Sequence, residues 1–307
     1  MAKKSEDILL ELDDTLLKAI DNFNGDIPKM QEEMLDRVIE LTTDLDRKNG
    51  NLVVSVKNLK IIRKIRKELA DSIVNDDYLK RVDEFANQFA EVQRINDLYF
   101  ASVSTQFAKR ELYTEIRKLA VEQTLEGLGK QGLSSNVIVP LADILNKNIT
   151  SGGSYKEFIG EVRGYLTNTD ESKGALDRYA KIYTIDAINQ FSAQYNQTIT
   201  EDLGFVWYYY AGDKMKTSRD FCIKMMEARN GGCMKFFHKS QIPELLKGHI
   251  CSGNVPIYKK INLPYGFKEG TNDVNFLTYR GGWGCQHRIT SVPSSVVPKK
   301  LHDMFGG

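Results

Sequence analysis

Cysteine and histidine, the side chains that most often bind soft metals or act as nucleophiles, are confined to the last third of this chain. The 307-residue sequence holds four cysteines and four histidines, and none of them lies before residue 222. The seven that lie within one stretch of 66 residues are Cys222, Cys233, His238, His249, Cys251, Cys285 and His287. This restriction indicates that the C-terminal part carries a chemistry, or a means of stabilisation, that the rest of the chain lacks.

A structural metal is the first interpretation. Tetrahedral zinc takes four Cys or His ligands, which usually come as two closely spaced pairs. Two close pairs exist here, His249 with Cys251 and Cys285 with His287, but a single residue separates the members of each pair. Ten residues lie between Cys222 and the next cysteine, and no Cys-x-x-Cys occurs. The spacing is compatible with a structural metal, but it does not specify a complete ligand set.

Two kinds of enzyme could use the same residues. A cysteine nucleophile at Cys222 needs a histidine base and an orienting carboxylate, and the candidates are His238, His287, Asp213 and Asp220. A nuclease could instead use His287 and Arg288 on a phosphate, although this region has few carboxylates to hold a catalytic divalent ion. Neither pattern supplies an oxyanion or substrate element, so we predict that the protein is not an enzyme and has no small-molecule substrate.

A purely structural interpretation competes with both. Cys222 and Trp283 would then belong to the core of a small domain, and the glycines beside Trp283 would allow a tight turn and a close approach of backbones. A buried Trp283 would make its replacement by Ala cost about 3–5 kcal/mol. The loops would be fixed by ion pairs that join Arg219 and Arg288 to carboxylates such as Asp213 and Asp220.

Helices must position most of these residues, because the first 200 residues show helical periodicity. A Pro- and Gly-free stretch over 77–126 would span about 75 Å as one helix, so we predict either a break at Ser102–Thr105 or a rod that packs against other helices. A basic helix over 57–69 is interpreted as a solvated face in preference to a nucleic-acid contact. Other helices are predicted over 28–45, over 137–147, from a capping box at Ser154-x-x-Glu157, and over 172–202.

The composition changes at Gly204, where glycine and proline become frequent. Aromatic and β-branched residues over 205–210 predict a strand, a short helix carrying Cys222 should start near Thr217–Asp220, and the Pro-flanked segment 289–297 closes the chain. Glycines at 127, 129 and 132 predict a flexible connection upstream. The fold class is therefore α+β, with three parts: an extended helical region 1–130, a helical part 131–203 and a small α+β domain 204–307.

Charge and hydropathy limit the environment. No apolar run approaches the roughly 20 residues of a membrane span, and the start of the chain has no signal-peptide pattern, so we expect synthesis in a cytoplasm, free thiols rather than disulfides, and no membrane partner. Residues 204–307 hold 15 basic against 7 acidic side chains, a net charge of +8. A basic surface of this size could contact DNA or an acidic protein, or it could be an ordinary solvated surface.

Two phrases of the sequence carry a resemblance. They are Gly212-Asp213-x-x-x-Thr217-Ser218-Arg219-x-Phe221-Cys222 and Gly281-Gly282-Trp283-x-Cys285-x-His287-Arg288. With the helices and strands around them, residues 152–293 resemble the phage head morphogenesis, or Mu F-like minor head protein, family. Many members carry Cys-x-x-Cys in the first phrase, where only Cys222 stands here, and an Arg where this chain has Gln286. Cys222, Cys285 and His287 match the family by position, whereas Cys233, His238, His249 and Cys251 lie in an insert.

The resemblance implies a minor structural protein of a tailed-phage head. Such a protein is a virion component at the head or portal vertex, is assembled in the host cytoplasm, and associates with the portal protein or the major capsid protein. Some members contact DNA and influence its packaging or ejection. A structural zinc would involve Cys222, Cys285 and His287. The alternative is a nucleic-acid-cleaving or zinc-stabilised DNA-binding protein that acts through the basic C-terminal domain.

Overall fold

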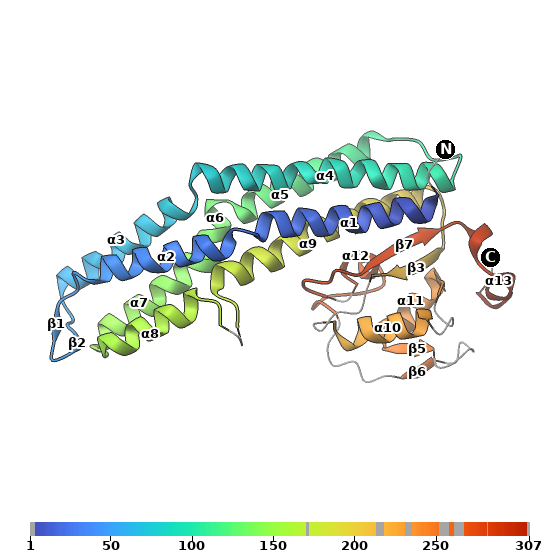
Figure 1. Cartoon of the computed structure of the whole chain (residues 1–307). Coiled ribbons are helices and arrows are strands. Elements are labelled where there is room, and N and C mark those ends of the chain that lie inside the picture. Colours follow the sequence, from blue (N-terminus) through green and yellow to red (C-terminus); the bar gives the residue numbers. More distant parts are fainter. Residues whose placement is uncertain are drawn as a thin grey trace. The chain divides into compact units, whose positions relative to one another are not determined.

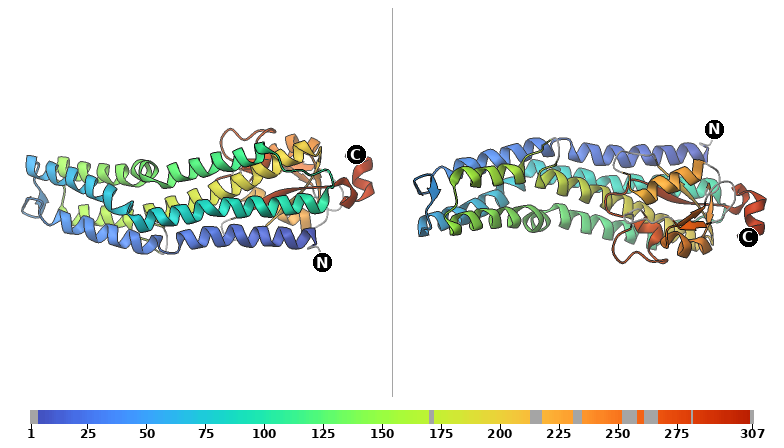
Figure 2. Two further views of the ribbon diagram at one scale, coloured as in Figure 1. Left: turned by 90° about the horizontal axis from the view of Figure 1, so that it is seen from above. Right: turned by 90° about the horizontal axis from the view of Figure 1, so that it is seen from below.

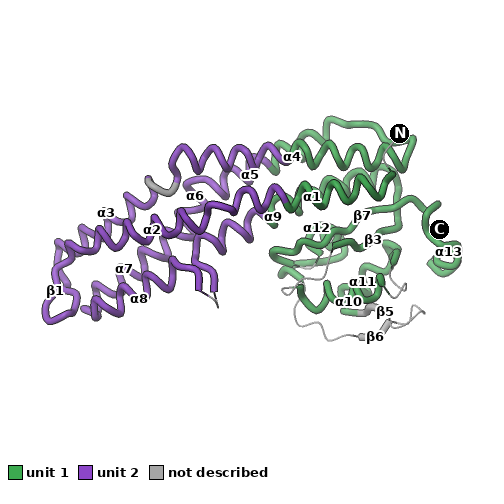
Figure 3. Tube along the Cα trace, viewed as in Figure 1, with its two compact units in different colours: residues 1–17, 89–120, 185–307 green, residues 18–88, 121–184 purple. Residues whose placement is uncertain are grey.

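A computed structural model describes residues 4–169, 172–212, 218–230, 235–251, 258–260, 267–280 and 282–305. Helices make up most of the chain, and short antiparallel strands follow in its C-terminal part (Figure 1), so the predicted α+β class is confirmed. The chain divides into two compact units (Figure 3), unit 1 with residues 1–17, 89–120 and 185–307, and unit 2 with residues 18–88 and 121–184. The three-part division expected from the sequence stays a prediction.

Unit 2 is a helical bundle. Helix α2 contacts α3 and α8, and α7 contacts the same two helices, so the four run side by side in both views of Figure 2. Their bounds are α2 Ile27–Thr42, α3 Val56–Ile73, α7 Val139–Ser151 and α8 Tyr155–Leu166. The helices predicted over 28–45, 57–69 and 137–147 are confirmed as α2, α3 and α7. A two-residue hairpin, β1 (Arg47–Lys48) with β2 (Asn51–Leu52), joins α2 to α3.

Helix α8 begins where the capping box was predicted, but the cap itself is absent. The side chain of Ser154 accepts no hydrogen bond from the first turn. The backbone of Ser154 instead forms a β-bridge with Asn51, and the next amide, that of Tyr155, donates to the carbonyl of Gly50 at 3.0 Å. The β1–β2 hairpin thus fixes the start of this helix, a contact that the local sequence pattern does not contain.

The long Pro- and Gly-free stretch breaks at the predicted place. Helix α4 covers Asp76–Val103 and α5 covers Glu111–Leu128. At the break the Ser102 hydroxyl donates to the carbonyl of Tyr99 at 2.7 Å, and the Ser104 hydroxyl accepts from the amide of Gln106 at 3.2 Å. Serine side chains that bond to nearby backbone groups compete with helical hydrogen bonds. The rod alternative is therefore wrong for this segment.

The glycines at the junction of α5 and α6 pack closely, so the predicted flexible connection is wrong. Helix α5 is followed directly by α6 (Lys130–Leu133) and by a π-helical turn over Ser134–Ile138 that leads into α7. A Cβ on Gly132 would collide with the backbone of Gly127, and a Cβ on Gly127 would collide with the ring of Tyr183. Glycine stands at these two positions because the neighbouring groups leave no room for a side chain.

Two further long helices are α1 and α9. Helix α1 covers Ser5–Asn24, and α9 covers Ala175–Asp202, which confirms the helix predicted over 172–202. The helices α1, α4, α5 and α9 each contribute residues to both units. In unit 1, α4 and α9 are joined by the Tyr195 hydroxyl, which donates to the carboxylate of Asp97 at 2.5 Å.

Unit 1 contains a three-stranded antiparallel sheet with β3 in the centre. Strand β3 pairs with β7 from Trp207 opposite Val292 to Ala211 opposite Arg288. The strands are β3 Trp207–Ala211, β4 Phe237–His238 and β7 Arg288–Val292. Strand β3 confirms the strand expected over 205–210, and β7 overlaps the start of the Pro-flanked segment 289–297. Pro293, which has no amide hydrogen to donate to a ladder, follows the end of β7. A second pair joins β5 (His249–Cys251) to β6 (Tyr258–Lys260).

Side chains of β3 alternate between two cores, as the pleat of a strand requires. Tyr208 and Tyr210 belong to a large cluster with Phe221 and Cys222 of α10 (Asp220–Asn230). Trp207 belongs to a smaller cluster with Val292, against which Phe305 of α13 packs. The short helices of this part of unit 1 are α11 Ile242–Leu246, α12 Phe276–Tyr279 and α13 Lys299–Phe305.

Candidate functional site

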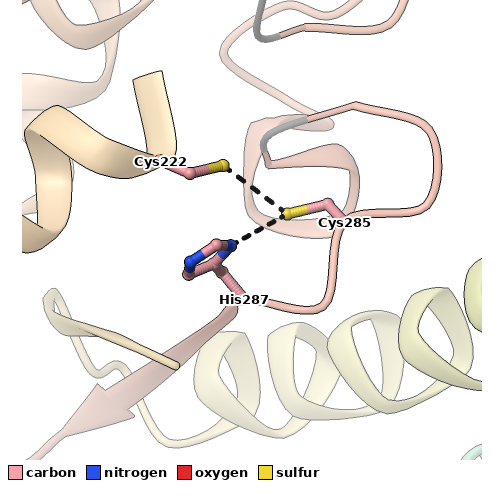
Figure 4. A group of neighbouring side chains, drawn as sticks. All are labelled: Cys222, Cys285 and His287. Atoms are coloured by element: carbon pink, nitrogen blue, oxygen red, sulfur yellow. Dashed lines mark hydrogen bonds between the residues drawn. The ribbon is translucent and has the colours of Figure 1, made fainter. Parts of the chain in front are cut away.

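The structure brings together Cys222, Cys285 and His287. Cys222 lies in the first turn of α10, Cys285 lies in the loop between α12 and β7, and His287 directly precedes β7 (Figure 4). The Sγ atoms of the two cysteines are 3.9 Å apart, and Cys285 Sγ is 3.7 Å from His287 Nδ1. Among the described residues, this is the group of Cys, His, Asp and Glu side chains with ligand atoms close enough for one metal ion, all within 4.8 Å of one another.

All three side chains are shielded from water. The exposed fractions are 1% for Cys222, 6% for Cys285 and 3% for His287. Both cysteines are free thiols, and their sulfur atoms are much farther apart than the roughly 2.0 Å of a disulfide bond. The ring of Tyr210 stacks on His287 with a centroid distance of 5.4 Å and closes one side of the group. A substrate would have no direct access to a nucleophile here.

Hydrogen bonding gives the two thiols opposite roles. The hydrogen bond from Cys222 lowers the pKa of Cys285 well below its usual range, and His287 contributes in the same direction against the effect of burial. The same hydrogen bond, together with burial, raises the pKa of Cys222. Both shifts favour a proton on Cys222 over a proton on Cys285. A thiolate is the form of cysteine that binds metals.

Glycine at position 212 allows the first phrase to approach the second. Gly212 has a φ of 119°, and a Cβ at this position would lie 2.9 Å from Cδ2 of His287. Any L-residue here would be strained and would push against the imidazole. The loop that carries Cys285 also turns through two left-handed glycines, Gly282 with φ 88° and Gly284 with φ 64°.

Charged residues from outside the two phrases hold the loop that carries Cys285 and His287. The carboxylate of Asp186 accepts from the amide of Gly284 at 2.7 Å and pairs with the ammonium group of Lys268 at 3.3 Å. Burial raises the pKa of Asp186 and lowers the pKa of Lys268, while their ion pair opposes both changes. Arg280 donates to the carbonyl of His287 and, at 2.8 Å, to that of Asn189. The backbone on both sides of Cys285 is thus fixed.

Trp283 is not part of the core. Its exposed fraction is 60%, and its ring lies over the ammonium group of Lys268 at 3.7 Å from the centroid. The backbone carbonyl of Trp283 accepts a hydrogen bond from Arg219. The expectation that Trp283 is buried is therefore wrong: the left-handed glycines that flank it turn the ring outward while its backbone is held. The buried tryptophan of this part of the chain is Trp207.

Arg288 has a partner that the sequence did not indicate. It is buried and donates to Asp13 at 2.6 Å and to the carbonyl of Leu9 at 3.0 Å, both in α1. Among the described residues its carboxylate partner is therefore Asp13 and not the expected Asp220, since β7 places Arg288 beside α1. Asp213, Thr217, Gly281 and Cys233 lie outside the described residues. His238 belongs to β4, where its Nδ1 lies 2.8 Å from the Ser240 hydroxyl, and His249 and Cys251 belong to β5.

Sequence reasoning missed the residues that support the site. Asp186 and Asn189 lie on the buried side of α9, which also holds other buried polar residues such as Ser192 and Asn196, so no local pattern set these two apart. Lys268, Arg280 and Asp13 had no local signal either, because their roles depend on contacts with residues distant in the chain.

A surface hollow lies in unit 2, beside the basic helix α3. Its lining includes Asp46 and three lysines, Lys57, Lys60 and Lys64. Lys57 pairs with Asp46 at 2.6 Å, and Lys64 lies 3.6 Å from Glu68. Exposed pairs of this kind are typical of a solvated helix face, which is how the sequence pattern of this helix was interpreted.

Comparison of the chain with protein-family models, with curated proteins and with solved structures found no match. Among the described residues, every helix is too short or too polar to cross a lipid bilayer.

Proposed function

We propose that this chain is a minor structural protein of a tailed-phage head, bound to the portal protein or to the major capsid protein inside the shell. In this role it is a virion component that acts in head assembly and in DNA packaging or ejection. The proposal starts from the resemblance of residues 152–293 to Mu F-like minor head proteins.

One observation carries the proposal beyond the sequence. The two phrases on which the resemblance rests are about 60 residues apart, yet three pairs of residues bring them into contact. Arg219 donates to the Trp283 carbonyl, Cys222 lies 3.9 Å from Cys285, and Gly212 lies against His287. Phrases that recur together in a family are expected to form one structural module, and this packing supports that expectation.

The burial of His287 and Arg288 favours a structural role for this module over a catalytic one. His287 is 3% exposed and Arg288 is 7% exposed, and Arg288 is engaged by Asp13 and the Leu9 carbonyl. A nuclease would need both side chains free to reach a phosphate, so their burial gives the nuclease alternative no support. Contact with DNA through the basic C-terminal region stays a prediction.

Trp283 is the side chain best placed to contact a protein partner. Large aromatic residues that are exposed on a fixed backbone are frequent anchors of protein interfaces. Trp283 meets this description, because Arg219 holds its carbonyl and Lys268 lies against its ring. Its partner in the proposal is the portal or capsid protein.

The test is co-expression of the full chain with the portal, scaffold and major capsid proteins of the genome that encodes it, followed by purification of procapsids. We expect the chain to copurify with procapsids and to bind the isolated portal or capsid protein. Trp283→Ala should weaken this association about tenfold or more, whereas Val274→Ala, which removes another exposed apolar side chain of unit 1, should not. A wild-type chain absent from procapsids that also fails to bind either protein would rule the proposal out.

A further inference from the structure

We infer that Cys222, Cys285 and His287 bind one divalent metal ion with the ligand preferences of zinc. The ion would join the first turn of α10 to the start of β7. This inference concerns the stability of unit 1 and does not depend on the location of the protein in a virion.

The distances between the donor atoms suit a tetrahedral ion. With metal–sulfur bonds of about 2.3 Å and metal–nitrogen bonds of about 2.0 Å, two ligand atoms of a tetrahedral zinc lie roughly 3.5–3.8 Å apart. The two Sγ atoms are 3.9 Å apart, and Cys285 Sγ is 3.7 Å from His287 Nδ1. The third separation, between Cys222 and His287, is at most 4.8 Å. A side-chain movement of about 1 Å at most would bring the third separation into the range of a tetrahedral zinc.

The chemistry of the donor set selects the kind of ion. Two sulfur atoms and one imidazole nitrogen form a borderline-soft set, which favours zinc over the hard ions magnesium and calcium. Among the described residues, no Asp or Glu carboxylate joins the group, so it lacks the oxygen ligands that hard ions prefer. Three protein ligands leave the fourth position of a tetrahedral zinc for a further donor such as water.

Packing alone does not account for the group. A buried imidazole is costly unless its nitrogen atoms have partners. Among the described residues, the partner of His287 Nδ1 is the sulfur of Cys285 at 3.7 Å, which is a weak hydrogen-bond partner for an imidazole. A metal ion bound between this nitrogen and the two sulfur atoms would give all three donors a strong partner.

The backbone around the ligands is held independently of any ion. Asp186 binds the amide of Gly284, and Arg280 binds the carbonyl of His287. Gly212 fits against the imidazole. Metal sites depend on outer contacts of this kind, which orient the ligands before the ion arrives. Residues other than the three ligands therefore hold the ligand group in place.

The experiment measures metal in the full chain. Protein purified from zinc-supplemented cells is analysed by elemental mass spectrometry, and cobalt(II) is then exchanged into the site. We expect about one zinc per chain and, with cobalt, the intense near-ultraviolet absorption of thiolate–cobalt bonds. Cys222→Ser, Cys285→Ser and His287→Gln should each lose most of the metal. His238→Gln is the matched control, since His238 contacts Ser240 and Trp207 instead, and it should keep the metal.

Stability supplies a second readout. A chelator should lower the Tm of the wild-type chain and leave the Tm of the three ligand variants unchanged, because binding to the folded state alone adds to stability. Less than about 0.2 zinc or cobalt per folded wild-type chain, against the single ion of a structural site, would overturn the inference. Since this result is read on the wild type, it stands even if a variant fails to fold. Metal retained by all three ligand variants would overturn it as well.

Discussion

The two tryptophans of this chain provide a sharp test of the fold of unit 1. Trp207 is fully buried, with its ring 5.0 Å from His238, 5.3 Å from His302 and 6.2 Å from Phe305 between centroids. Trp207→Ala removes a large side chain from this cluster and should cost about 3–5 kcal/mol. For a unit of this size, that loss corresponds to a fall in Tm of roughly 6–20 °C.

Trp283→Ala should cost far less. Its ring is 60% exposed, and its main contact is the ammonium group of Lys268 at 3.7 Å. Loss of such a cation–π contact is worth about 0.5–1 kcal/mol at an exposed site. Trp207→Phe should also be milder than Trp207→Ala, since Nε1 of Trp207 is buried without a hydrogen-bond partner among the described residues and phenylalanine removes that unsatisfied donor.

Unfolding in denaturant, followed by circular dichroism, compares the three variants with the wild type. Tryptophan fluorescence adds an independent measurement, because Trp283→Phe leaves Trp207 as the single tryptophan and Trp207→Phe leaves Trp283. Acrylamide should readily quench the fluorescence of Trp207→Phe, whose remaining tryptophan is exposed. It should hardly quench that of Trp283→Phe until the protein unfolds. Equal loss of stability for the two alanine variants, or equal quenching of the two single-tryptophan proteins, would refute this placement of the rings.

Two further predictions concern unit 2 and the tyrosines. Gly132→Ala should destabilise by roughly 1–3 kcal/mol because its Cβ would meet backbone, whereas Gly160→Ala in α8, with nothing within 4 Å of the added Cβ, should stabilise by about 0.5–1 kcal/mol; denaturant midpoints of both variants show whether the signs differ. Burial raises the pKa of Tyr208 to about 12, so its contribution to stability is complete below about pH 10, the usual tyrosine pKa, and is lost as the pH rises toward 12. Tyrosinate absorbance should then increase together with loss of the circular dichroism signal, and complete titration near pH 10 in a folded chain would contradict this.

Local patterns were sufficient for most helices and for the two main strands. The 3.6-residue period located α2, α3 and α9, and the aromatic run located β3, because each pattern reflects which face of its own element is buried. The errors arose where a distant group decides the local structure. The start of α8 depends on a bridge to Asn51, and the packing at Gly127 depends on Tyr183 of α9.

The candidate site follows the same division. Residue type gave seven candidates, and the resemblance to the minor head protein family selected Cys222, Cys285 and His287, which the structure places together. The side chains that orient them, Asp186 and Arg280, come from segments without a motif, so no spacing rule could connect them to the site. Trp283 was assigned to the core because it is large and apolar, but the direction of its ring depends on the left-handed conformation of Gly282 and Gly284.

Arg288 shows why the closing phrase depends on the beginning of the chain. Its guanidinium is buried, and although burial lowers the pKa of Arg288, arginine stays charged in proteins. A buried charge without a partner is strongly destabilising, and the partners here are Asp13 and the Leu9 carbonyl of α1, more than 270 residues away. Both belong to unit 1 together with β7. The residue after His287 is therefore held by α1, so the group of Cys222, Cys285 and His287 depends on the N-terminal helix and is properly studied in the full chain.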